Sequence, residues 1–181
     1  MNLTFIGDFK MANLFNNEEL NNVRNAAVEN RVYVETLMGI DVYVSDDICN
    51  YVTGGMDVAS AVADCDDDQN KVIYVNSKLL NGSKELYNSI CRHELGHIFS
   101  GHLNSEMKDC VIIDNNLELE ADAWAVKHGA NAQILRDHLK SAYDLQINLV
   151  GEEIYKQLVE TNETVKMIDE QLKDRIAALS K

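Results

Sequence analysis

Basic residues are scarce in this sequence, which has 16 lysines and arginines against 30 aspartates and glutamates and a formal net charge of −14. A surface of that average sign repels phosphate backbones and anionic lipid headgroups, and no lysine or arginine cluster offsets it. We therefore expect neither a nucleic-acid partner nor a membrane partner. The acidity itself indicates solubility and says nothing specific about a substrate. Proline is absent as well, and we connect no function with its absence.

Long apolar runs are also missing. No stretch approaches the roughly 20 apolar residues that a membrane helix needs, and the first ten residues lack the basic segment and apolar run of a signal peptide. The expected location is therefore the cytoplasm. The four cysteines, Cys49, Cys65, Cys91 and Cys110, are scattered without a C-x-x-C pair. In a reducing cytosol we expect free thiols and no disulfide.

The composition is that of an ordinary globular protein, with 46% hydrophobic and 25% charged residues among 181. That length suits one domain with an appended helical segment. We predict an α+β domain over residues 1–150 and a C-terminal amphipathic helix over 151–181.

The N-terminal half predicts a helix followed by short strands. Apolar residues recur near helical spacing over 17–38, and Gly39 would end this helix. Alternation predicts a strand over 40–44. Residues 58–65 and 71–76 are predicted to form two more strands, joined as a hairpin by an acidic turn. This turn lacks the ligand spacing of a calcium loop, so we interpret it as solvated.

Three helices are predicted in the second half of the chain. Ser83 is a candidate N-cap for a helix over about 84–100, and Gly101 would stop it. Two more helices are expected over about 117–128 and 131–142.

A strongly amphipathic helix is predicted over 152–179. Its apolar residues fall near an a/d pattern: Ile154, Leu158, Val165, Ile168, Leu172 and Leu179. Such a face could form the seam of a homodimer, or it could pack on the chain's own domain. The pattern does not choose between these two interpretations.

The motif that carries chemistry is His-Glu-Leu-Gly-His at 93–97. On a helix, His93 and His97 lie one turn apart on one face and can present ring nitrogens to a single metal ion. Glu94 would face a metal-bound water rather than the metal. A bound Zn²⁺ lowers the pKa of such a water to about 7, so a carboxylate can take its proton at neutral pH.

A catalytic zinc site needs a third protein ligand. His102 follows the motif, but it lies just past the same helix and is expected to be a helix-end residue. Glu118 and Asp122 share a face of the next helix, so one could bind metal while the other holds a ligand histidine. At about 100° per residue, Glu120 is expected to point away from them. His128 is ranked below Glu118 because it lies too far along that helix.

The sequence resembles the ImmA/IrrE-type metallopeptidases, of the gluzincin branch of the zincins, over about residues 72–128. The motif at 93–97 matches the family's zinc motif. The segment Glu-Leu-Glu-Ala-Asp-Ala-Trp-Ala at 118–125 resembles its E-x-E-A-[DN]-x-[FW]-A segment, and Val-Ile-Tyr-Val-Asn at 72–76 resembles its edge strand.

That resemblance implies a small twisted sheet of three to four strands, packed on an active-site helix and a glutamate helix. Glu118 would be the third zinc ligand, and Asp122 would support a ligand histidine. An extended peptide would add to the sheet edge near Tyr74. Family members often cleave helix-turn-helix repressors, so the implied substrate is a cytosolic regulatory protein. We find no helix-turn-helix in this chain.

The expected activity is endopeptidase cleavage, with Glu94 passing a proton from the attacking water to the leaving nitrogen. Tyr74, His102 and His128 are the candidate residues for contacting substrate or stabilising the oxyanion. One alternative is a non-catalytic zinc-binding zincin that binds a partner protein. Another is an interaction module in which the motif arose by chance.

Overall fold

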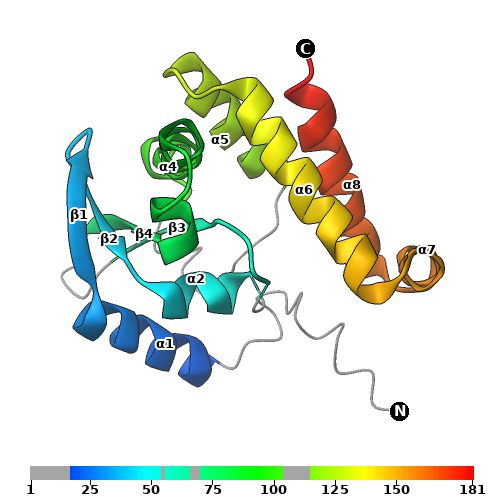
Figure 1. Cartoon of the computed structure of the whole chain (residues 1–181), viewed down its shortest axis with the longest axis horizontal. Coiled ribbons are helices and arrows are strands. Elements are labelled where there is room, and N and C mark those ends of the chain that lie inside the picture. Colours follow the sequence, from blue (N-terminus) through cyan, green and yellow to red (C-terminus); the bar gives the residue numbers. More distant parts are fainter. Residues whose placement is uncertain (1–16, 54–55, 66–69, 104–114) are drawn as a thin grey trace.

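The computed structural model describes residues 17–53, 56–65, 70–103 and 115–181. The chain forms a small mixed sheet with helices on both of its faces, which confirms the α+β class (Figure 1). In chain order the elements are α1 (Asn17–Asn30), β1 (Val32–Leu37), β2 (Ile40–Val44), α2 (Asp46–Val52), β3 (Ala61–Cys65), β4 (Lys71–Val75), α3 (Ser77–Leu80), α4 (Lys84–Phe99), α5 (Asn115–Lys127), α6 (Ala132–Val150), α7 (Glu152–Thr161) and α8 (Glu163–Ala178).

The four strands lie in the order β1-β2-β4-β3. The β1–β2 and β3–β4 pairs are antiparallel, and β2 runs parallel to β4. The hairpin predicted around β3 and β4 is confirmed, although residues 66–69 of its turn lie outside the described residues. The expectation that 72–76 forms a sheet edge is wrong, because β4 is paired on both sides and the edge strands are β1 and β3.

Alternate residues of β4 face two different apolar clusters. Val72 and Tyr74 pack with buried residues of α1 and α2 on one face of the sheet. Ile73 and Val75 pack with buried residues of α4 on the other face. Both faces are therefore covered, as a continuous apolar strand indicates. Figure 1 shows the sheet between α1 and α2 on one side and α4 on the other.

The predicted helix over 17–38 is too long. It ends at Asn30, and residues 32–37 pair with β2 as β1. Met38 and Gly39 join the two strands with φ values of 52° and 83°. A two-residue turn with positive φ at both positions matches the twist of a hairpin. Gly39 therefore serves a hairpin turn rather than a helix end.

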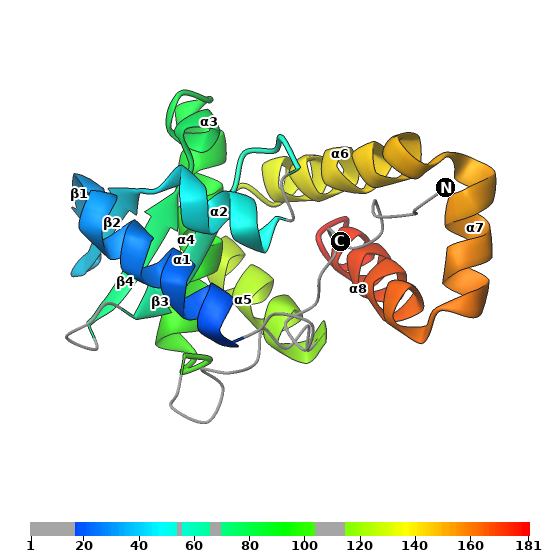
Figure 2. The same cartoon turned by 90° about the horizontal axis from the view of Figure 1, so that it is seen from below.

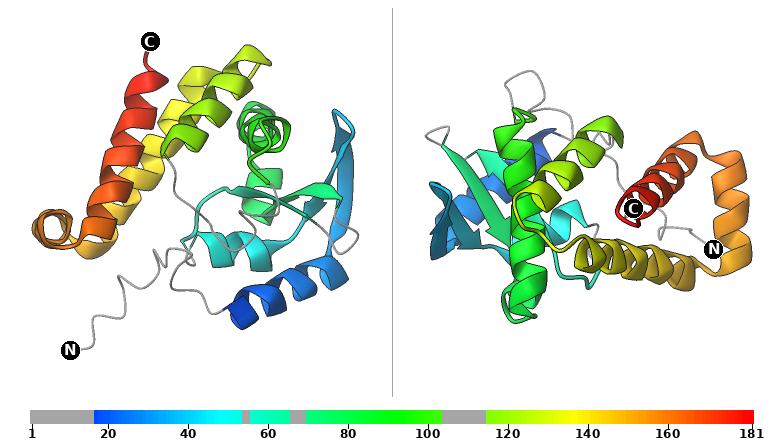
Figure 3. Two further views of the ribbon diagram at one scale, coloured as in Figure 1. Left: turned by 180° about the vertical axis from the view of Figure 1, so that it is seen from behind. Right: turned by 90° about the horizontal axis from the view of Figure 1, so that it is seen from above.

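The C-terminal segment is two helices rather than one. Asn162 has a φ of −124° and a ψ of 106°, which is not helical, and its side chain accepts hydrogen bonds from the amides of Thr164 and Val165 at the start of α8. Helix α8 turns back and contacts α5 and α6 (Figures 2 and 3). The segment thus packs on the chain's own helices, and a homodimer through it stays a prediction.

The predictions about the cysteines and about membrane-spanning helices can be compared with the structure. Cys49, Cys65 and Cys91 are free thiols, as predicted, and Cys110 lies outside the described residues. Among the helices of the described ranges, none combines the length and apolar character needed to cross a bilayer.

Candidate metal centre

Helix α4 presents the motif at its predicted place. The Ser83 hydroxyl accepts a hydrogen bond from the amide of Leu86, which confirms the N-cap. The helix ends at Phe99, and Gly101 follows with a φ of 80°, a conformation that favours glycine. His93 and His97 therefore lie one turn apart on the same face of one buried helix.

Helix α5 crosses α4 very closely at Gly96. A β-carbon at this position would lie 2.7 Å from the carbonyl oxygen of Ala121. Ala121 itself is fully buried. Glycine on one helix and alanine on the other thus permit the approach that brings Glu118, one turn before Ala121, to the histidines.

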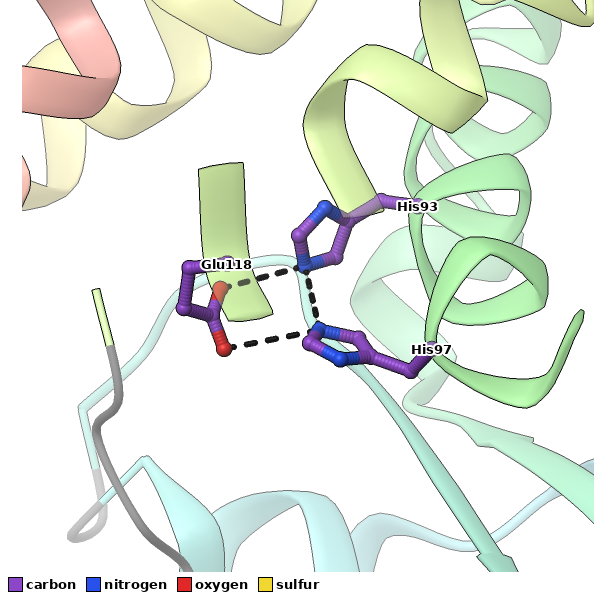
Figure 4. A group of neighbouring side chains, drawn as sticks. All are labelled: His93, His97 and Glu118. Atoms are coloured by element: carbon purple, nitrogen blue, oxygen red, sulfur yellow. Dashed lines mark hydrogen bonds and ion pairs between the residues drawn. The ribbon is translucent and has the colours of Figure 1, made fainter. Parts of the chain in front are cut away.

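His93, His97 and Glu118 form a compact cluster (Figure 4). Nε2 of His93 lies 3.1 Å from Nε2 of His97 and 3.3 Å from Oε2 of Glu118. Nε2 of His97 lies 3.4 Å from Oε1 of Glu118. One ligand atom from each side chain lies within 4.8 Å of the other two, so the three residues could hold a metal ion.

Asp122 holds the second nitrogen of His93. Nδ1 of His93 lies 2.8 Å from Oδ1 of Asp122, whose side chain is 3% exposed. In neutral His93, a proton on Nδ1 donated to this carboxylate would leave the Nε2 lone pair able to bind a metal. Burial and the charge of Arg175 lower the pKa of His93, but hydrogen bonds with Asp122 and Glu118 outweigh them and raise that pKa to about 10.

The second nitrogen of His97 is held by another histidine. Nδ1 of His97 lies 2.9 Å from Nδ1 of His102, and Nε2 of His102 lies 3.4 Å from Oε2 of Glu120. Helical angle alone placed Glu120 away from the site. In the structure the buried His102, which follows α4 in the chain, contacts the carboxylate of Glu120. His102 is therefore the neighbour of a candidate ligand rather than the third ligand.

Glu94 points from α4 to the edge of the sheet. Its Oε2 accepts a hydrogen bond of 2.8 Å from the backbone amide of Ala63 in β3. Burial raises the pKa of Glu94, and the nearby Glu118 adds to this, while His93 and His97 oppose it. A carboxylate with a raised pKa beside a metal cluster is suited to accepting a proton.

Arg175 of α8 is a member of the site that sequence reasoning missed. Its Nε and Nη2 donate to the two oxygens of Asp122 at 2.7 and 2.9 Å. Its Nη1 lies 2.6 Å from Oε2 of Glu118. The charge of Arg175 and hydrogen bonds from both histidines hold the pKa of Glu118 well below its usual value, against the effect of burial. His138 of α6 lies near enough for burial and the charges of Arg175 and His93 to lower its pKa.

Two of the residues predicted to contact substrate lie elsewhere. Tyr74 is 1% exposed and packs in the cluster between the sheet and α1 and α2. His128 is exposed and stacks on Trp124 with 3.8 Å between the ring centroids. It follows Glu118 by ten residues, which is about 15 Å along a helix axis. Neither residue joins the metal cluster.

No protein-family model, no curated protein and no solved structure matches this chain.

Proposed function

We propose that this chain is a zinc-dependent peptidase in which His93, His97 and Glu118 hold the metal and Glu94 is the general base. A single observation carries the proposal. The Nε2 atoms of His93 and His97 lie 3.1 Å apart, and the two carboxylate oxygens of Glu118 lie 3.3 and 3.4 Å from them, with one oxygen facing each imidazole. A tetrahedron built on bonds of about 2.0–2.1 Å has edges of about 3.3–3.4 Å. Two imidazoles and one carboxylate are also a ligand set of catalytic zinc sites, which keep a fourth position open.

The donor chemistry at this point is compatible with a metal. If both Nδ1 atoms carry protons, the two Nε2 atoms face each other at 3.1 Å as lone pairs. Two facing acceptors are unfavourable unless a proton or a cation lies between them. Bound zinc would supply a Lewis acid and a water of lowered pKa.

The environment of Glu94 supports its proposed role as the general base. The amide of Ala63 holds one carboxylate oxygen, which fixes the group, and the other oxygen remains able to accept a proton. In the proposed reaction Glu94 takes a proton from the attacking water and returns it to the leaving nitrogen.

The substrate is proposed to be an extended segment of a protein, in keeping with the resemblance to the ImmA/IrrE-type peptidases. A strand that adds to this sheet beside α4 must pair with β3 rather than β4, because β3 is the edge strand next to α4. The amide of Ala63 lies on that edge, beside the carboxylate of Glu94.

Metal analysis and a peptide library test the proposal together. The wild-type protein and Glu94→Gln are expected to bind one zinc per chain, and His93→Ala is expected to lose it. Incubation with a proteome-derived peptide library should produce new termini, read by mass spectrometry, with the wild type alone. A chelator should abolish them.

Two results would contradict the proposal in different ways. A wild-type chain that binds no zinc would refute the metal site itself. Equal cleavage by Glu94→Gln would refute the role of the base. Zinc binding with no cleavage of any peptide would instead support the non-catalytic alternative, a zincin that binds a partner protein.

A further inference from the structure

Helix α8 sends one side chain to the candidate metal centre. Arg175 lies in the last turn of this helix, and its side chain is 12% exposed. It meets Asp122 across 53 residues of sequence and forms two hydrogen bonds with that carboxylate. A third contact joins its Nη1 to Oε2 of Glu118 at 2.6 Å. One guanidinium therefore holds two carboxylates of the site, those of Asp122 and Glu118.

This arrangement differs from an ordinary surface ion pair. Exposed pairs contribute little because water screens them and both side chains lose freedom. Here the side chains of Asp122 and Glu118 are only 3% and 22% exposed. The planar guanidinium also offers its donors in a fixed geometry, so one side chain can set the direction of two others.

We propose that Arg175 is a positioning residue for the metal centre, and that α8 is thereby a working part of the site. The inference rests on the proposed zinc site. Arg175 acts through two residues. It holds the carboxylate of Glu118 toward the two imidazoles, and it fixes Asp122 on Nδ1 of His93.

Charge repulsion is the effect that opposes this role. The Nη2 atom lies 3.5 Å from both ring nitrogens of His93, so a bound cation would have a positive neighbour. The balance of charge nevertheless suits a divalent ion. Glu94, Glu118 and Asp122 supply three negative charges when ionised, and Arg175 leaves a net charge of −2. Positioning is therefore expected to outweigh repulsion.

Zinc affinity measured by competition with a chelating dye separates the two effects. Loss of a partner that orients a metal ligand typically weakens metal binding by about 10–100-fold. We expect that loss for Arg175→Ala. Arg175→Lys should bind more tightly than Arg175→Ala, because it retains the charge without the two-pronged geometry. Lys166→Ala, an exposed charge on the same helix, should bind like the wild type.

A second measurement reports the arrangement of the metal ligands rather than the zinc affinity. The absorption spectrum of the cobalt(II)-loaded protein responds to the arrangement of ligands. We expect it to change in Arg175→Ala and to be partly restored in Arg175→Lys. A merely structural role would change the melting temperature of the metal-free protein but leave this spectrum as it is.

The outcomes distinguish this inference from the proposed function. If the wild type binds no zinc, the metal site fails and the inference falls with it. If the wild type binds zinc and Arg175→Ala binds it equally or more tightly, only the role of Arg175 is overturned. Should Arg175→Ala fail to fold, Arg175→Lys decides alone, since wild-type affinity and spectrum in that variant would also overturn it.

Discussion

Replacing Gly96 with alanine tests how the candidate ligands are brought together. The added β-carbon would lie 2.7 Å from the carbonyl oxygen and 2.9 Å from the α-carbon of Ala121. Both atoms belong to the backbone of α5, so rotation of a side chain cannot relieve the contact. Helices α4 and α5 must move apart instead.

Two effects of opposite sign then compete in the stability of Gly96→Ala. Alanine is favoured over glycine inside a helix by about 0.8–1.0 kcal/mol. Overpacking of a close contact typically costs about 1–3 kcal/mol. Because the contact is with backbone, we expect the second effect to win and the free energy of unfolding to fall by about 1 kcal/mol.

The same movement should weaken metal binding. Restoring ordinary van der Waals distance requires a shift of about 0.5–1 Å. Metal–ligand distances tolerate only about 0.2 Å. Glu118 lies one turn from Ala121 and moves with α5, so zinc affinity should fall by about tenfold or more.

Denaturant unfolding and zinc competition measure these two quantities for Gly96→Ala. The control is Ala123→Gly on the exposed face of α5. It should lose about 1 kcal/mol through helix propensity alone and keep its zinc affinity. A Gly96→Ala protein that is more stable than the wild type and binds zinc equally well would refute the reasoning.

Two further predictions concern the residues around the ligands. The metal-free protein should be most stable between about pH 4.5 and 6.5. The pKa of His93 is raised to about 10 in the folded protein, against 6.5 in the unfolded chain. Its contribution to the stability of the folded state is therefore complete below pH 6.5 and is lost as the pH rises toward 10. Because the pKa of Glu118 is lowered in the folded protein, its ionised carboxylate stabilises the folded state above pH 4.5, and this contribution is lost as the pH falls. Melting temperatures against pH test this, and His93→Gln should flatten the alkaline arm. Separately, His102→Ala should weaken zinc binding by about 10–100-fold, whereas the exposed His128→Ala should not. Equal effects would contradict the assignment.

The part of the site that follows local geometry could be predicted from the sequence. Residues four apart on one helix share a face, and that rule alone pairs His93 with His97 and Glu118 with Asp122. The structure brings these two pairs together. The helical angle predicts that Glu120 points away from the site, yet its carboxylate lies 3.4 Å from His102, the neighbour of His97. This contact was missed because the chain beyond α4 carries His102 to Glu120.

The first hairpin was missed for a different reason. Apolar residues at 34 and 37 fit a helix as well as a strand, so periodicity did not discriminate. The stronger signal was the paired alternation of residues 32–37 and 40–44 around a two-residue turn. Methionine is uncommon at positive φ, so Met38 concealed that turn.

Arg175 could not be predicted because no local pattern marks it. An arginine near the C-terminal end of an amphipathic helix usually interacts with the helix dipole or faces solvent. Only the return of α8 against α5 places it beside Asp122 and Glu118.

The contacts of Arg175 also bear on the predicted boundary between the α+β domain over 1–150 and the C-terminal segment over 151–181. All three candidate metal ligands precede that boundary, so a chain ending there would contain every ligand atom. It would lack the side chain that joins Glu118 to Asp122 and, through Asp122, to His93. Each candidate ligand is thus held by a partner from outside its own helix: His93 by α5, His97 by the chain after α4, and Glu118 by α8. Because those partners come from three separate segments, the geometry of the cluster depends on the packing of the whole second half of the chain.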